Sequence, residues 1–176
     1  MIFQETPIPG CFLIEPEERR DERGFFARLY CDDEFAAQGL DFKPLQINRS
    51  HNPHLHTLRG LHFQDPPFAE AKLVGVGRGS VFDVVVDLRR QSPTFRRWEG
   101  FALSAANGRQ LFIPEGCAHG FLTLEPDTDM IYLMGRKHVP GRARGHRYDD
   151  PAFAIVWPAP PALIGPTDLA WPAFEA

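Results

Sequence analysis

Residues 81–89 read VFDVVVDLR, a run in which side chains of one kind recur at every second position. Phe82, Val84 and the other even-numbered residues form an apolar face, whereas Asp83 and Asp87 lie on the opposite face. Successive side chains of a β-strand point to opposite sides of the sheet. The pattern therefore predicts a strand with one face in a hydrophobic core and the other able to meet polar groups.

Turn signals on both sides of this strand predict strand neighbours. The preceding segment KLVGVGRGS (72–80) contains two turn-prone glycines near its end, which predicts the first arm of a hairpin with 81–89. The segment WEGFALSAANGRQLFIPEG (98–116) repeats the pattern, with a turn at Asn107-Gly108 between one strand and a second over 109–113.

Further short strands and little helix are expected in the rest of the chain. GFFARLY (24–30) and DMIYLMG (129–135) are strand candidates. The best helix candidate is CDDEFAAQG (31–39), with an Asp cap, acids in the first turn and Gly39 as its stop. Many short strands with one or two short helices predict an all-β fold, and a double-sheet jelly roll fits.

The composition is that of one ordinary globular domain spanning residues 1–176. Of these residues 43% are apolar and 24% are charged, and the length allows a sizeable core. The 17 prolines disfavour long helices. From about residue 158 the chain is a Pro-rich tail, which we expect either to wrap the surface or to reach another subunit.

Charge and hydropathy exclude several classes of partner. A net charge of −4 argues against nucleic acid, whose binding proteins normally carry a basic face. No apolar run approaches the roughly 18 residues of a membrane span, and residues 1–10 lack the pattern of a signal peptide. Three widely spaced cysteines fit neither a disulfide framework nor a zinc site, so we expect a cytoplasmic protein.

A histidine cluster raises the hypothesis of a metal site. HNPHLH (51–56) supplies imidazoles at i, i+3 and i+5, and IPEGCAHGF (113–121) resembles the second half of a metal-binding cupin motif. The first half of that motif also needs a carboxylate, and none occurs between His56 and Asp65. HNPHLH equally fits a solvated loop, so we expect no metal.

Residues 58–64, LRGLHFQ, place a permanent cation and an imidazole in a segment otherwise typical of a buried strand. Buried charge is costly without a partner or a function. Strand parity puts Arg59 and His62 on opposite faces, so both reach one ligand only if Gly60 supports a bulge or twist. His62 is a candidate general base, because the reference pKa of imidazole is about 6.5. A structural histidine is the alternative.

Three other polar residues are candidates for chemistry or binding. Lys72 begins an apolar strand, where a surface lysine that snorkels to solvent is the alternative. Tyr132 lies mid-strand, where a core tyrosine with a hydroxyl partner is common. Arg23 in DERGFF either caps a turn or binds an anion, and its guanidinium suits phosphate, as does that of Arg59.

These segments together resemble the dTDP-4-dehydrorhamnose 3,5-epimerase family. The resemblance runs in the same order over nearly the whole chain, and the combination of LRGLHFQ with IPEGCAHGF is its most specific part. The other matching segments are DERGFF (21–26), AKLV (71–74), VFDVVVDLR (81–89), SPTF (92–95), DDPAFAIVWP (149–158) and Asp168. The resemblance implies a cupin-like jelly roll without cofactor or metal, and a homodimer with exchanged N-terminal strands.

The same resemblance implies an enzyme that inverts centres flanking the 4-keto group of a nucleotide-linked sugar. His62 would remove the α-proton with Asp168 as its partner, and Tyr132 would return a proton from the opposite face of the ring. Lys72 would stabilise the enolate, which forms quickly only where preorganised positive charge meets the oxyanion. The substrate-binding residues that the resemblance implies are Arg23, Phe26, Arg28, Gln46, Asn48, Arg59, His119 and His138.

The chain departs from the family pattern at positions that recognise the nucleotide. The family has Glu where this chain has Arg28, a thymine-stacking aromatic where it has His138, Glu near Ala143 and Lys near Thr167. The proton-transfer set is complete, so the departures concern the nucleotide base and the sugar, with a dTDP-linked sugar as the default partner. Residue identity does not separate members that invert C3 or C5 alone from those that invert both.

Two other functions remain as alternatives. A metal-dependent cupin oxygenase or isomerase would use HNPHLH and His119, and metal analysis of the purified protein distinguishes it. A non-catalytic module would bind a sugar nucleotide without proton exchange. That module would have no need of an acid and a base that face each other.

Overall fold

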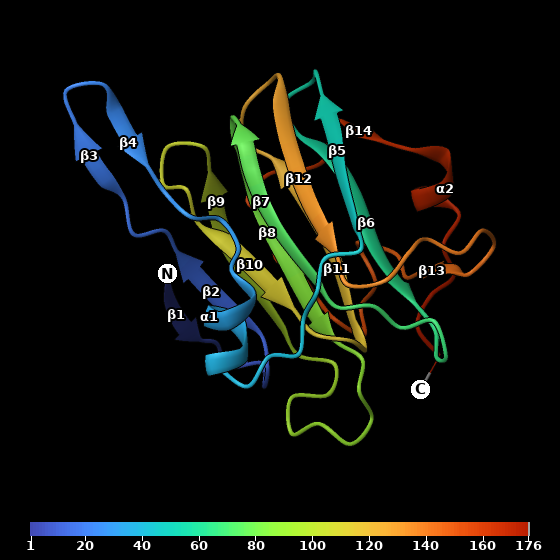
Figure 1. Ribbon diagram of the computed structural model, residues 1–176. Coiled ribbons are helices and arrows are strands. Elements are labelled where there is room, and N and C mark those ends of the chain that lie inside the picture. The colour runs from blue at the N-terminus through green and yellow to red at the C-terminus, as the bar shows by residue number, and fades with distance from the viewer. Residues whose placement is uncertain (176) are drawn as a thin grey trace.

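The computed structural model describes residues 1–175, which form two facing antiparallel sheets and a projecting hairpin (Figure 1). The first sheet has the strand order β1 (Ile2–Glu5), β2 (Phe12–Glu15), β10 (Gln110–Ile113), β7 (Lys72–Arg78), β12 (Thr128–Met134) and β5 (Gln46–Asn52). The second has the order β13 (Ala143–Gly145), β6 (Thr57–Gln64), β11 (Cys117–Thr123), β8 (Ser80–Asp87) and β9 (Trp98–Ser104), and β14 (Leu163–Ile164) pairs in parallel with β6. The hairpin consists of β3 (Arg19–Asp21) and β4 (Gly24–Phe26).

This arrangement confirms the prediction of an all-β jelly roll with two short helices. The main core lies between the sheets, where Val81 and Val85 of β8 meet Val74 of β7 and Leu111 of β10. A second cluster covers the outer face of the first sheet, where Phe35 packs among other aromatic side chains. Both faces of the first sheet are therefore partly buried.

Helix α1 (Asp32–Ala37) falls within the predicted segment, but its predicted Asp cap is wrong. Cys31 occupies the N-cap position, and no side chain among residues 1–175 caps the helix there. The helix ends as predicted, because Gly39 has a φ of 73° and its N–H bonds back to Ala36. Its fixed position comes from Phe35, which is fully buried.

The strand at residues 81–89 is buried on both faces, which corrects the expectation of one polar face. Phe82, Val84 and Val86 pack under the C-terminal segment, which contributes Phe153 and Trp157 to that cluster. The opposite face belongs to the core between the sheets, with Asp83 as a buried polar residue. The tail beyond residue 158 therefore wraps the surface, and Phe174 packs in the same cluster.

Both predicted hairpins are wrong in their pairing, although their strands exist. β7 and β8 are separated by Gly79 alone yet belong to different sheets, because the chain crosses between the sheets at this residue. Gly79 has a φ of 78°, and a Cβ there would lie 2.3 Å from Oγ1 of Thr128. β8 pairs instead with β9, which follows it, and β9 and β10 likewise lie in different sheets.

The predicted strand at 24–30 is shorter than expected and ends at Phe26. It forms the β3–β4 hairpin, which projects from the body of the molecule at the upper left of Figure 1. The predicted strand at 129–135 is present as β12. In residues 1–175, no helix has the length and hydropathy that a membrane span requires.

Candidate active site

A cavity of about 320 Å³ opens between the two sheets, and polar side chains from both line it. β5, β7 and β12 of the first sheet supply Asn48, Lys72 and Tyr132. β6 and β11 of the second sheet supply His62 and His119. Residues from five strands, far apart in the sequence, therefore meet around one space.

The imidazole of His62 pairs with the carboxylate of Asp168. Its Nε2 lies 2.6 Å from Oδ1 of Asp168, and the N–H of Gly60 donates to the other carboxylate oxygen at 3.2 Å. Burial opposes ionisation of Asp168, but the bonds and charge of His62 and the bond from Gly60 outweigh it and lower the pKa of the carboxyl. Asp168 lies in helix α2 (Pro166–Leu169), which β14 positions by pairing with β6.

Arg59 and His62 line the same cavity although they are three residues apart on one strand. The register between β6 and β11 shifts between the pairs His119–His62 and Phe121–Arg59. Gly60, at the shift, has a φ of 120°, and a Cβ there would lie 2.6 Å from the Cα of Gly120. The predicted irregularity at Gly60 is therefore present, and it changes the strand parity.

Lys72 is buried against the cavity and has an acidic neighbour. Its Nζ lies 3.8 Å from Oε1 of Glu70. Burial lowers the pKa of Lys72, whereas the charges of Glu70 and Asp83 oppose that shift. The alternative of a snorkelled surface lysine is excluded, because only 5% of the residue is exposed.

Tyr132 faces the cavity from the opposite sheet to His62. Its hydroxyl lies 3.1 Å from Oγ of Ser50, and its ring centroid is 6.5 Å from that of His119. Burial raises the pKa of Tyr132 to about 12, despite the opposing effect of the bond with Ser50. The phenol is therefore a proton donor over the whole neutral pH range.

His119 lies close to site residues of both sheets, His62 and Tyr132. In the β6–β11 ladder it is the direct partner of His62, and its Nε2 lies 2.9 Å from Oδ2 of Asp83. Both His119 and Asp83 are buried. Burial raises the pKa of Asp83, and the charge of His119 and the hydrogen bond with it oppose this shift.

Other predicted binding residues lie in or beside this cavity. Arg59 donates from Nε to Oδ1 of Asn52 at 2.7 Å, which fixes the direction of its guanidinium. Gln46 donates to Oδ1 of Asn48 at 2.9 Å and accepts from the backbone N–H of His138 at 3.1 Å. Gln46 and His138 therefore extend the polar surface that Asn48 begins.

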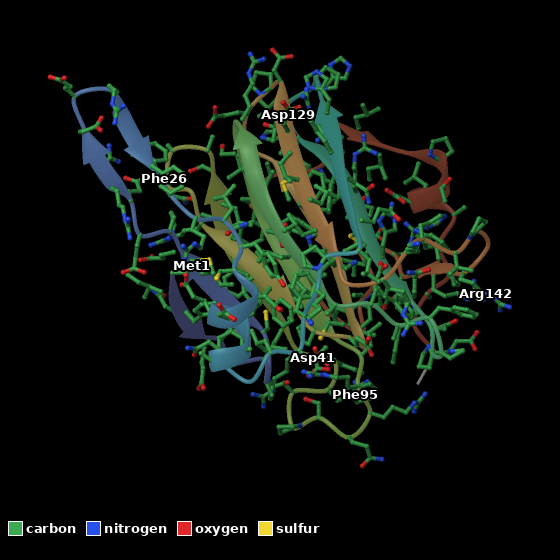
Figure 2. All side chains as sticks on the ribbon, viewed as in Figure 1. Met1, Phe26, Asp41, Phe95, Asp129 and Arg142 are labelled. Atoms are coloured by element: carbon green, nitrogen blue, oxygen red, sulfur yellow. The ribbon has the colours of Figure 1, made fainter. Side chains whose placement is uncertain are left out.

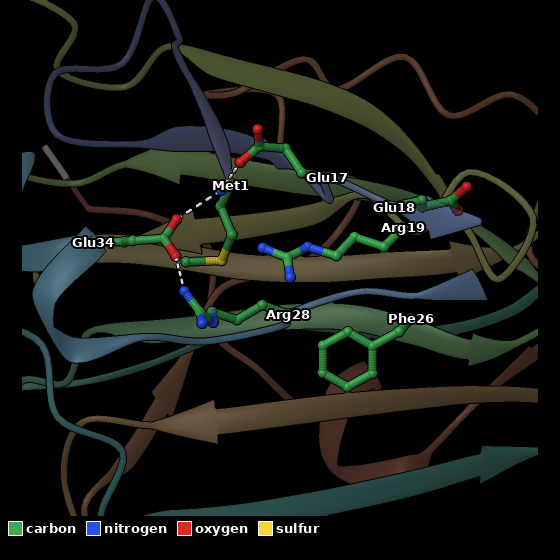
Figure 3. Close-up of a pocket in the computed structure, with 7 residues that line it drawn as sticks. All are labelled: Met1, Glu17, Glu18, Arg19, Phe26, Arg28 and Glu34. Carbon is green, nitrogen blue, oxygen red and sulfur yellow. Dashed lines mark hydrogen bonds and ion pairs between the residues drawn. The ribbon is translucent and has the colours of Figure 1, made fainter. Parts of the chain in front are cut away.

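Three predicted binding residues lie elsewhere in the protomer. Arg23 and Phe26 belong to the projecting hairpin, on which Figure 2 labels Phe26. Phe26 is 71% exposed. Phe26 and Arg28 line a separate pocket of about 310 Å³, where Arg28 pairs with Glu34 at 2.5 Å (Figure 3). The structure of one protomer does not bring these three residues to the cavity of His62.

The HNPHLH segment does not gather around His119. His51 bonds through Nδ1 to Oδ1 of Asp129 at 2.8 Å, whereas His119 bonds to Asp83. Among residues 1–175, no group of three or more His, Cys, Asp or Glu side chains is placed to hold a metal ion. The donor set of the cupin alternative is therefore not assembled.

Two cavity-side residues escaped the sequence prediction. Trp171 donates from Nε1 to Oδ1 of Asp168 at 3.3 Å, and its ring meets that of His62 edge to face at 6.0 Å. Glu70 lies beside Lys72. For both residues the signal in the sequence was the distance along the chain to a predicted site residue. Trp171 follows Asp168 by three positions, about one helical turn. Glu70 precedes Lys72 by two positions, which places both on the same face of an extended segment.

Comparisons with known proteins agree with this fold. Residues 5–176 match the family model described as dTDP-4-dehydrorhamnose 3,5-epimerase. A relative of that name from Sinorhizobium fredii is 42% identical over 158 residues, which cover 90% of this chain and 81% of the relative. A dTDP-4-dehydrorhamnose 3-epimerase from Streptomyces niveus is 40% identical over 169 residues, covering 96% and 81%.

A solved structure gives the same result in three dimensions. The dTDP-4-dehydrorhamnose 3,5-epimerase of Bacillus anthracis, solved with TDP and PPi bound, has a TM-score of 0.95 and 38% identity. The match covers 98% of this chain and 99% of that one. Fold and site thus define a cupin-like carbohydrate epimerase, which is an isomerase. The chain belongs to the dTDP-4-dehydrorhamnose 3,5-epimerase family.

Proposed function

We propose that this protein inverts C3, C5 or both in a dTDP-linked 4-keto-6-deoxy sugar by removing and returning a proton next to the ketone. His62 is the base, Lys72 stabilises the enolate oxygen, and Tyr132 delivers the proton from the opposite face of the ring. Each group contributes one part of a single reaction class, proton abstraction α to a carbonyl.

The observation that carries this proposal is that His62 and Tyr132 belong to opposite sheets and line one cavity of about 320 Å³. Inversion requires an acid and a base on opposite faces of the reacting carbon. His119 lies between the two sides, as the ladder partner of His62 and with its ring centroid 6.5 Å from that of Tyr132. A sugar ring bound in this cavity would therefore meet a proton acceptor and a proton donor.

The pairing with Asp168 supports one tautomer of His62 in this proposal. An ionised carboxylate accepts a hydrogen bond, so Nε2 carries the proton and the lone pair lies on Nδ1. When Nδ1 takes the sugar proton, the imidazolium that forms is stabilised by the charge of Asp168. The lowered pKa of Asp168 keeps that charge present at neutral pH.

As protonated groups, Lys72 suits the stabilisation of the enolate and Tyr132 suits the delivery of the proton. A buried ammonium acts strongly on a developing oxyanion, because little solvent screens it. The phenol of Tyr132, with a pKa raised to about 12, holds its proton until the enolate carbon takes it. The hydrogen bond with Ser50 orients the phenol while the cavity is empty of substrate.

The nucleotide handle that we propose is dTDP. The support is that the relatives named above act on dTDP-linked sugars by name, and that the Bacillus anthracis structure holds TDP. Arg59, Asn48 and His119 contact the sugar and diphosphate, and Gln46 and His138 lie toward the nucleotide. The relatives named above include both a 3,5-epimerase and a 3-epimerase, so the position at which solvent hydrogen enters the sugar identifies the centre that is inverted.

The active form in this proposal is a cytoplasmic homodimer. The hairpin of one protomer and the residues that follow it bring Arg23, Phe26 and Arg28 to the cavity of the partner. The exposure of Phe26 and the projection of β3 and β4 (Figure 1) support this arrangement. The unpaired thiols of Cys11, Cys31 and Cys117 suit a reducing compartment. Light scattering in solution should give twice the mass of one chain.

The test of the reaction is solvent exchange. Incubated with dTDP-4-keto-6-deoxyglucose in deuterium oxide, the wild-type protein should introduce deuterium at C3, C5 or both, and His62→Ala should abolish it. His51→Ala is the matched control, because His51 lies outside the cavity and should leave exchange intact. Exchange that survives His62→Ala, or that His51→Ala removes, would contradict the assigned base.

A further inference from the structure

Glu70 is a cavity residue to which the proposed mechanism gives no role. Its side chain is 9% exposed and lines the cavity. One carboxylate oxygen, Oε2, accepts a hydrogen bond from Nε2 of Gln64 at 2.6 Å. The other, Oε1, lies 3.8 Å from Nζ of Lys72. A buried carboxylate of this kind is costly unless it is paired, and here both of its oxygens face a donor.

Glu70 contacts residues of both sheets beside the cavity. Gln64 ends β6, the strand that carries His62, and Lys72 begins β7 in the opposite sheet. Gln64 is itself buried, and its Oε1 has no hydrogen-bond partner within residues 1–175. The Gln64 amide is therefore oriented by Glu70, and Glu70 in turn is held at a fixed distance from the ammonium.

The other groups around Lys72 provide less compensation for its charge. Asp83 on β8 faces Lys72, but both of its carboxylate oxygens lie within 3.0 Å of Nε2 of His119. Cys117 on β11 also faces Lys72, and burial raises the pKa of its thiol to about 12, so the thiol is neutral. Glu70 is the carboxylate in ion-pair distance of Lys72 among the described residues.

We propose that Glu70 is a positioning residue that keeps the Lys72 ammonium charged and directed into the cavity. The inference rests on the proposed function, in which the charge of Lys72 stabilises the enolate. Because Glu70 is negative and Lys72 is positive, the pair has no net charge that would repel the substrate diphosphate. The ammonium still presents its hydrogens to the ketone oxygen. Without Glu70, burial alone would favour the neutral amine.

The first experiment measures the protonation of Lys72 directly. The chain has three lysines, at positions 43, 72 and 137, so the ε-carbon signals of protein labelled with ¹³C-lysine can be assigned by single substitutions. Glu70→Gln keeps the shape of the side chain and its bond with Gln64 but removes the charge. Its Lys72 signal should titrate at a lower pH than in the wild type, whereas Lys43 and Lys137 should titrate unchanged.

The second experiment measures turnover. Glu70→Gln should lower kcat roughly tenfold with little change in KM, because a weakened charge on Lys72 acts mainly on the transition state. The alkaline limb of its pH profile should also move to lower pH, because the neutral amine forms earlier. Glu70→Asp retains the charge and should restore most of kcat. Glu125→Gln is the matched control, because that carboxylate bonds to Ser80 outside the cavity.

The outcomes separate the two proposals. A Lys72 titration that is identical in wild type and Glu70→Gln overturns the role of Glu70, whatever the enzyme does. A shifted titration with an unshifted pH profile also overturns it, because the charge would then have no bearing on turnover. A wild-type protein without solvent exchange overturns the proposed function, and the lysine titration still reports on the pair.

Discussion

Nε2 of His62 lies 2.6 Å from Oδ1 of Asp168, although 106 positions separate the two residues in the chain. The contact depends on β14, whose Ile164 pairs with Leu58 at the start of the strand that carries His62. Trp171 also donates a hydrogen bond from Nε1 to Oδ1 of Asp168. The carboxylate partner of the proposed base is therefore supplied by a C-terminal segment that pairs with β6.

The first prediction concerns this pair. Asp168→Asn should reduce solvent exchange roughly 10²–10³-fold, because the amide no longer stabilises the imidazolium or fixes its tautomer. The variant should also unfold at a somewhat lower temperature, because the paired carboxylate stabilises the fold. Asp149→Asn, which breaks an exposed pair with Arg147 in the same C-terminal region, should retain normal exchange. Equal rates for Asp168→Asn and the wild type would refute the pairing as a catalytic feature.

Tyr132→Phe should separate exchange from inversion. The enolate still forms at His62, but no phenol is present to protonate its opposite face, so the proton returns from the side it left. Proton NMR in deuterium oxide should show deuterium entering the sugar with its configuration retained, and inversion reduced about 100-fold. Tyr148→Phe, outside the cavity, should behave as wild type. Undiminished inversion in Tyr132→Phe would assign the acid to another group.

Lys72→Met should lower kcat roughly 10²–10³-fold while KM changes little, because an oxyanion donor acts mainly on the transition state. The comparison is Lys43→Met, which removes an exposed lysine that lies 3.7 Å from Asp32. That variant should retain full activity. A loss in Lys72→Met that appears mainly in KM would instead assign Lys72 to substrate binding.

Gly60→Ala should destabilise the protein by about 3 kcal/mol and remove activity. The alanine would combine a φ of 120° with a Cβ placed 2.6 Å from the Cα of Gly120. Gly24→Ala separates these two effects, because Gly24 has a φ of 123° but no described atom lies within 4 Å of the added Cβ. Urea unfolding should show a clearly larger loss for Gly60→Ala. Equal losses would place the cost in the backbone angle alone.

The carboxylate of Asp87 should make the stability of the protein fall as the pH becomes acidic. Burial opposes its ionisation, but hydrogen bonds from Arg89, Ser92 and Thr94 outweigh burial and lower the pKa of this carboxyl from 3.8 to about 2. A lowered pKa means that the stabilisation is present above pH 3.8 and is lost as pH falls through about 2. The contribution at pH 7 is about 2 kcal/mol.

Asp87→Asn tests this directly. The variant should be less stable than the wild type at pH 7, and the difference should shrink as urea unfolding is repeated between about pH 4 and pH 2. A difference that stays constant with pH would attribute the effect to packing of the loop rather than to the carboxylate.

Local patterns predicted strands well and strand partners poorly. The alternation at residues 81–89 correctly predicts β8, but it did not predict that both faces of the strand are buried. Proximity in sequence suggested β7 as a partner, whereas the partners are β9 and β11. Partner choice follows from how two sheets share a core, which a single strand does not encode.

The candidate site was predictable where a residue has a distinctive chemical type in a recognisable motif. His62, Lys72, Tyr132 and His119 all line one cavity, and Asp168 contacts His62. Glu70 and Trp171 belong to no motif, and their spacing from Lys72 and Asp168 was the one signal in the sequence, which alone did not identify their contacts. Arg23, Phe26 and Arg28 lie away from the cavity in one protomer, so their predicted roles depend on how two protomers assemble.

The crossing of the chain at Gly79 has a consequence for the kinetics of folding. Because neighbouring segments such as β7 and β8 do not pair, each sheet is completed by ladders between distant segments, for example β2 with β10 and β5 with β12. Contacts between strands that are distant in the sequence form slowly, so we expect refolding in roughly milliseconds to seconds. Strand edges stay exposed during that time, so the yield of refolded protein should fall as its concentration rises.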